Sequence, residues 1–136
     1  MTDIDENTLS LIKENSEMVV QKLDELVDFK FGYDEDSMEW FDGYVKRLYE
    51  SGFFEGKFER MLSVLGSYAG EAIIARYGGK WAYFDEGLGI QIAERFIAFP
   101  FTKLEKQMQG GEGDSIISFY RSIEAIISLK NKENDL

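Results

Sequence analysis

The stretch MLSVLGSYAGEAIIA, residues 61–75, decides how this chain of 136 residues folds. Its only charged residue is Glu71, so a helix through it is apolar nearly all round, and such a helix is buried. Four of its residues are small: Gly66, Ala69, Gly70 and Ala72. Because a helical glycine costs about 1 kcal/mol relative to alanine, we expect a neighbouring element to approach closely there. The sequence therefore predicts a central buried helix over residues 54–77.

Two amphipathic helices are predicted before this buried helix. Between residues 9 and 26, apolar side chains recur at helical spacing on one face, which indicates a surface helix. Asn7 or Thr8 is the expected cap, and Gly32 is the expected stop. A second helix should begin near Asp34 or Asp36, whose carboxylates suit the positive end of a helix.

Residues 80–99 predict a small sheet after the buried helix. Three short apolar segments, at residues 81–84, 89–93 and 96–99, are joined by links too short for a parallel crossover. They indicate a three-stranded antiparallel sheet that is inserted between the third and fourth helices and closed by Pro100.

Two further helices complete the prediction. Thr102 and Glu105 have capping-box spacing and indicate a short fourth helix, and Asp114 is the expected cap of the fifth. The predicted fold class is α+β, with about five helices and one three-stranded sheet in a single domain over residues 1–136.

The charge of the chain is concentrated in its N-terminal part. The formal net charge is −11; residues 1–59 hold 16 acids and 6 bases, and residues 60–136 hold 10 acids and 9 bases. Such a field repels nucleic acid and anionic lipid and attracts basic proteins. The alternative is that the acidity only promotes solubility. We expect no nucleic acid and no membrane among the partners.

The composition also excludes several kinds of site and of cellular location. The chain has no cysteine and no histidine, which excludes disulfides, thiolate metal sites and imidazole catalysis. No apolar run approaches the length of a membrane span, and no signal peptide is visible, so a cytoplasmic location is expected. We expect no metal ion, no cofactor and no catalytic residue with an assigned role, and the oligomeric state stays open.

Several stretches together resemble an uncharacterised family of small bacterial proteins, a domain of unknown function. They are YDEDSMEWFDGY at residues 33–44, LGSYAGE at 65–71, YGGKW at 77–81, FPFTK at 99–103 and GDSIISFY at 113–120. The likeness covers about residues 30–127. It implies a bacterial, cytosolic setting and carries over no catalytic residue.

Glu71 is the first candidate functional residue. A carboxylate in an apolar helix needs a cation, hydrogen bonds or a proton, and a raised pKa would suit a general acid or base. The alternative is a structural ion pair with a cation of the chain. The cations considered for that pair are Arg76, Lys80, Arg95, Lys103 and Arg121.

Two other sets of residues are candidates for binding. Glu35, Glu39 and Asp42 share a face of the second helix that is suited to a basic partner, although dipole complementarity and solvation explain them as well. The aromatic side chains of Trp40, Tyr44, Trp81 and Tyr83 are candidates for lining a pocket between helices and sheet, with core packing as the alternative.

The sequence favours a binding protein over an enzyme. The leading hypothesis is an acidic protein-binding module, with an immunity-type inhibitor of a basic toxin as its most concrete form. A small-molecule-binding module that uses an aromatic helix–sheet cleft is the alternative, and an enzyme built on Glu71 is the third hypothesis.

Overall fold

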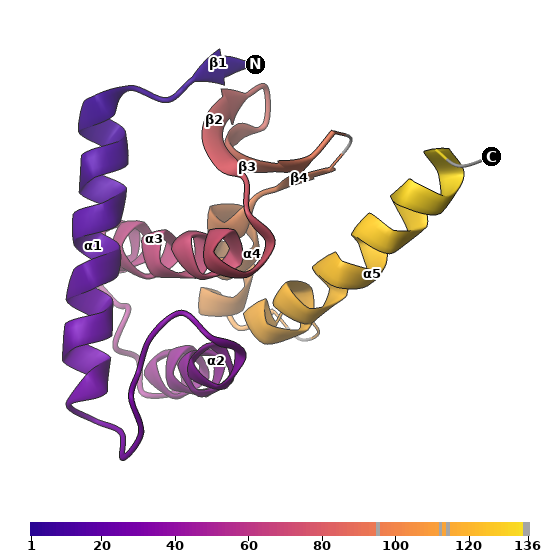
Figure 1. Cartoon of the computed structure of the whole chain (residues 1–136). Coiled ribbons are helices and arrows are strands. Elements are labelled where there is room, and N and C mark those ends of the chain that lie inside the picture. The colour runs from indigo at the N-terminus through magenta and orange to yellow at the C-terminus, as the bar shows by residue number, and fades with distance from the viewer. Residues whose placement is uncertain (95, 112, 114, 135–136) are drawn as a thin grey trace.

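The computed structural model describes residues 1–94, 96–111, 113 and 115–134. Within these residues the chain forms five helices and one antiparallel sheet of four strands in the order β1-β2-β3-β4 (Figure 1). The helices are α1 (Glu6–Asp24), α2 (Glu35–Glu50), α3 (Phe58–Tyr77), α4 (Pro100–Met108) and α5 (Ile116–Asn134). The strands are β1 (Thr2–Asp3), β2 (Lys80–Phe84), β3 (Gly87–Ala93) and β4 (Phe96–Ala98). The α+β class is therefore confirmed.

Helix α3 is the buried centre of the molecule, as its sequence predicts. It packs against both α1 and α4. The predicted close approach is found at two of the four small residues. A Cβ at Gly66 would overlap the ring of Phe101, and a Cβ at Gly70 would overlap the ring of Trp81. The helix begins four residues later than predicted, because residues 51–57 form turns in which Gly52 and Gly56 adopt positive φ angles.

Helix α1 differs from the prediction at both ends. Its cap is Asp5, whose carboxylate accepts a hydrogen bond from Thr8 N at 3.0 Å. It ends at Asp24, well before Gly32. The chain leaves the helix early because the side chain of Phe31 turns inward and is buried, and Asp24 holds this loop by accepting a hydrogen bond from Phe31 N at 2.9 Å.

The sheet has one strand more than predicted. Strand β1 pairs with β2 in the register Thr2↔Tyr83 and Asp3↔Ala82, so the prediction of three strands was wrong. Both residues of β1 are exposed and show no alternation, so they form a strand only because the edge of β2 offers them hydrogen-bond partners.

Helix α4 begins at Pro100 instead of Thr102. Proline suits the first turn of a helix because the amide hydrogen that it lacks would have no partner there. Pro100 thus ends the sheet region and begins the next helix. The predicted cap Asp114 lies outside the described residues. In the part of the chain that the structure describes, no helix combines the length and the apolar character needed to cross a membrane.

Candidate functional site

The three acidic residues predicted to meet a partner all have contacts within the chain. Glu35 Oε1 lies 2.7 Å from Arg76 Nη1 and 3.6 Å from Arg121 Nε, and Glu39 Oε2 lies 3.5 Å from Arg121 Nη2. The hydrogen bond from Arg76 lowers the pKa of the Glu35 carboxyl. A partner that bound these carboxylates would first have to displace these contacts.

Asp42 caps α5 from the neighbouring helix α2. Its Oδ1 accepts hydrogen bonds from Ser115 Oγ at 2.8 Å, from Gln107 Nε2 at 3.0 Å and from Ile117 N at 3.3 Å. Gln107 Oε1 in turn accepts a hydrogen bond from Ile116 N at 2.8 Å. The first amides of α5 are thus satisfied by side chains from α2 and α4, and Asp42 has a structural role that its sequence position did not indicate.

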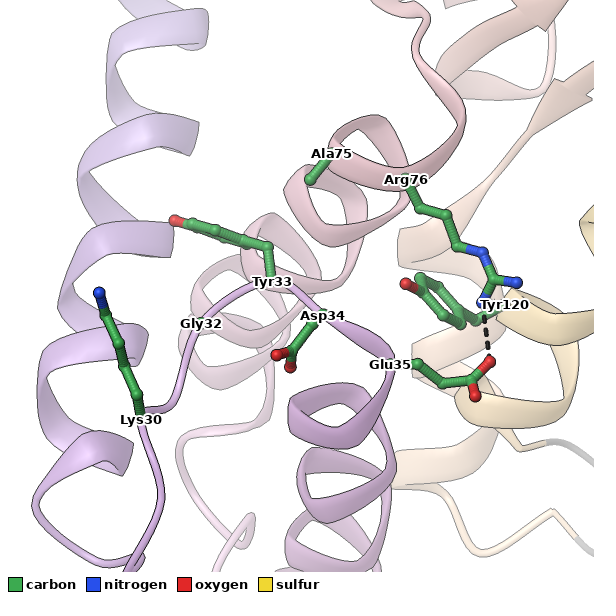
Figure 2. Close-up of a pocket in the computed structure, with 8 residues that line it drawn as sticks. All are labelled: Lys30, Gly32, Tyr33, Asp34, Glu35, Ala75, Arg76 and Tyr120. Carbon is green, nitrogen blue, oxygen red and sulfur yellow. Dashed lines mark hydrogen bonds and ion pairs between the residues drawn. The ribbon is translucent and has the colours of Figure 1, made fainter.

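A groove of about 610 Å³ contains Arg76 and is shown in Figure 2. The guanidinium carbon lies 5.1 Å from the ring centres of both Tyr77 and Tyr120, and the guanidinium also pairs with Glu35 and Glu124. These contacts join α2, α3 and α5. Because Arg76 already has two carboxylate and two aromatic contacts, we interpret it as a clamp between helices.

Glu71 contacts a tryptophan and a lysine, and the lysine, Lys13, is not one of the cations that the sequence predicted for this ion pair. Its Oε2 accepts a hydrogen bond from Trp81 Nε1 at 2.9 Å, and its Oε1 lies 3.5 Å from Lys13 Nζ. Lys13 belongs to α1, which lies across α3 and is remote from Glu71 in sequence. Arg95, one of the cations considered, lies outside the described residues. The Glu71 side chain is 15% exposed and faces a groove of about 310 Å³ that is also lined by Ile4 and Ile74.

The four aromatic candidates occupy different places. Trp40 and Tyr44 stack on each other along α2, with ring centres 5.2 Å apart. Trp81 is buried in β2 against Phe101, and the Tyr83 hydroxyl donates a hydrogen bond to Asp5 at 2.8 Å. Trp40 lines one groove, and Trp81 lines the groove beside Glu71.

The groove beside Trp40 brings together two kinds of predicted site residue. We call it the acidic aromatic groove; its volume is about 630 Å³, and its lining residues are Phe29, Lys30, Asp34, Asp36, Glu39 and Trp40. It is built from the loop after α1 and the first two turns of α2. Phe31, buried beneath, holds both aromatic walls: its ring centre lies 6.4 Å from that of Phe29 and 6.0 Å from that of Trp40.

The lining of this groove is predominantly acidic. Its lining carries three carboxylates and one ammonium group. Hydrogen bonds from Ser37 lower the pKa of the Asp34 carboxyl, which therefore stays ionised near neutral pH. The ring of Trp40 already has a cation near it, since the guanidinium carbon of Arg47 lies 5.3 Å from the ring centre. The sequence indicated Glu39 and Trp40 as site residues, and it indicated Asp34 and Asp36 at the start of the second helix. It did not indicate Phe29, because the bend that brings Phe29 to α2 has no local signature.

No protein-family model matches the chain, and neither a curated protein nor a solved structure matches it. The resemblance to a bacterial family of unknown function therefore stays a prediction.

Proposed function

We propose that the protein is a binding module that holds a basic segment of another protein in the acidic aromatic groove. The observation that carries this proposal is the placement of two aromatic side chains, Phe29 and Trp40, among the carboxylates of Asp34, Asp36 and Glu39. A guanidinium or ammonium group gains both from charge-assisted hydrogen bonds with carboxylates and from contact with an aromatic face. An arginine side chain supplies the planar cation that suits both contacts best.

The charge distribution of the chain supports the same proposal. Residues 1–59, which include α1, α2 and the groove, carry a net charge of −10, against −1 for the remainder. A one-sided field of this kind draws a basic protein towards the acidic side and accelerates association at low salt. In the immunity-type form of the proposal, the bound segment belongs to a basic toxin and projects lysine or arginine side chains into the groove.

The direct test uses a short amidated peptide in which arginines alternate with glycines. Its control is the same peptide with citrulline in place of arginine, because citrulline keeps the shape and removes the charge. Binding is followed by NMR at the Trp40 indole and by titration at two salt concentrations. We expect the arginine peptide to shift the Trp40 signal, with an affinity that falls as salt rises. The citrulline peptide should bind at least about tenfold more weakly.

Matched variants connect this binding to the groove. Phe29→Ser should weaken binding, whereas Phe53→Ser should not, although both phenylalanines are 38% exposed. Asp36→Asn should reduce the salt dependence, and Asp85→Asn, in the turn between β2 and β3, should leave it unchanged. Equal binding of the two peptides, or equal effects of Phe29→Ser and Phe53→Ser, would contradict the proposal.

A second candidate function is small-molecule binding in the groove beside Glu71. The observation in its favour is that this groove lies at the junction of helices and sheet and combines Ile4, Leu9 and Ile74 with the indole of Trp81. A ligand that occupied it would raise the melting temperature of the protein. A screen of small amphipathic compounds by thermal shift tests this candidate: a hit must lose its effect in Ile74→Ser. A screen that yields no such hit would exclude the candidate for the compounds tested.

A further inference from the structure

The outer side of α1 carries large apolar side chains that the fold does not cover. Leu11 is 53% exposed and Met18 is 43% exposed, and their spacing of seven residues places them on one side of the helix. Leu26, in the turn that follows α1, is 60% exposed. We call these three residues the α1 stripe. In Figure 1, α1 runs along one side of the molecule.

The inner side of the same helix accounts for its packing in the fold. Ile12, Ser16, Val19 and Leu23 are buried there, and α1 packs chiefly on α3. Fold stability therefore does not require the α1 stripe to be apolar. Exposed apolar side chains in a row on a helix are typical of a surface that meets another protein.

Exposed acidic side chains lie beside the α1 stripe and favour a basic binding partner. Glu14 and Glu25 are exposed beside the stripe, and in the described part of the chain neither of them forms an ion pair, whereas the base beside the stripe is Lys22. Two copies of this chain would each bring a net charge of −11, which opposes self-association, and an anionic membrane would be repelled. A helix with one apolar face and basic flanks is complementary in both respects.

We infer that the α1 stripe docks an amphipathic helix with basic flanks that belongs to another protein. The inference rests on the proposed binding of a basic protein and adds a second contact surface to it. The groove takes single cationic side chains, whereas the stripe takes the apolar face of a helix. The two contacts are therefore separable by substitution.

The probe is a labelled, amidated peptide of about 18 leucine and lysine residues, with leucine at helical spacing so that it forms an amphipathic helix on binding. Its control is a peptide of the same composition in an order that spreads leucine around the helix. Binding is measured by fluorescence anisotropy at about 50 and 300 mM salt. We expect the amphipathic peptide to bind at least about tenfold more tightly than the control peptide.

The variant Leu11→Ser/Met18→Ser should lose at least about tenfold in affinity for the amphipathic peptide. The matched variant Leu129→Ser, which removes a 62% exposed leucine from α5, should retain wild-type affinity. Glu14→Lys/Glu25→Lys should weaken binding and flatten its salt dependence, whereas Glu105→Lys on α4 should change neither by as much. Circular dichroism establishes that each variant is folded.

Wild-type affinity of Leu11→Ser/Met18→Ser would overturn the inference, even if the arginine peptide binds in the groove. Equal binding of the two leucine–lysine peptides would overturn it as well, because charge alone would then account for the interaction. Stripe-dependent binding to zwitterionic vesicles would assign the surface to lipid and would also overturn it. The proposed function is judged separately by the effects of Phe29→Ser and Asp36→Asn on the arginine peptide.

Discussion

Helices α1 and α3 lie against each other and show opposite relations between sequence and surroundings. Nine residues of the 20-residue helix α3 are buried, against four of the 19 residues of α1. Residues 64–74 of α3 are all buried or half-buried, and two of its glycines leave room for aromatic rings. In α1 the inner side maintains the fold and the outer side is available for a partner. Substitutions on α3 should therefore change the packing of the fold, whereas substitutions on the outside of α1 should change binding.

The largest expected effect is at Gly70. In Gly70→Ala the new Cβ would overlap the ring of Trp81, so packing strain should outweigh the better helix propensity of alanine and lower the unfolding free energy by about 2 kcal/mol. Gly43→Ala in α2 is the matched control, because its Cβ would meet only the flexible end of Arg47. That variant should gain about 0.5 kcal/mol. Urea unfolding measures both, and similar values would mean that the Trp81 ring can move aside.

The contact between the two helices at Glu71 should give the next largest effect. Glu71→Ala leaves Trp81 Nε1 without its acceptor and should cost about 1–2 kcal/mol of unfolding free energy. Glu71→Gln keeps an acceptor and loses only the pair with Lys13, which is 57% exposed, so it should cost well under about 1 kcal/mol. Lys13→Met should resemble Glu71→Gln. If Glu71→Gln costs as much as Glu71→Ala, the ion pair dominates instead of the indole hydrogen bond.

A smaller effect on stability, present only at acidic pH, is expected at Asp5, the cap of α1. Hydrogen bonds from Thr8 and Tyr83 lower the pKa of Asp5 from 3.8 to about 2. Because the folded-state pKa is depressed, this stabilisation is fully present above the unfolded-state value and is lost as pH falls from 3.8 towards 2. Asp5→Asn retains a cap but not the charge, so its melting temperature should fall less steeply over this range than that of the wild type. Parallel curves for the two proteins would contradict the assignment.

The smallest expected effect is on the α1 stripe. Leu11→Ser and Met18→Ser should each change the unfolding free energy by less than about 0.5 kcal/mol, because both side chains are largely exposed in the folded chain. Thermal and urea unfolding, with Leu129→Ser as the reference, measure the difference. A loss of unfolding free energy several times larger would show that these side chains contribute to the fold. The outer side of α1 would then resemble α3 in this respect.

Features that depend on local chemistry were predictable from the sequence. Asp34 is the cap of α2, as expected, and accepts a hydrogen bond from Ser37 N at 2.9 Å. The burial of α3 and the close approaches at Gly66 and Gly70 follow from composition alone. Strand β1 and the early end of α1 could not be predicted, because the first depends on the edge of β2 and the second on the buried ring of Phe31.

The candidate site was predictable only in part. Glu39 and Trp40 were indicated by charge and aromatic character, and both line the acidic aromatic groove. The contacts of Asp42 with Gln107 and Ser115, and that of Glu71 with Lys13, join residues far apart in the chain. No spacing rule relates such residues. An acidic residue on a helix looks the same in sequence whether it faces solvent or caps another helix.

The overlap of glycine positions in α3 with aromatic rings has an evolutionary consequence. Residues 70 and 81 share one volume, as do residues 66 and 101, so neither member of a pair can grow unless the other shrinks. Each pair should therefore change as a unit among descendants of a common ancestor: a larger side chain at position 70 should accompany a residue smaller than tryptophan at position 81. These two coupled substitutions provide a signature by which distant kin of this chain can be told from unrelated acidic helical proteins.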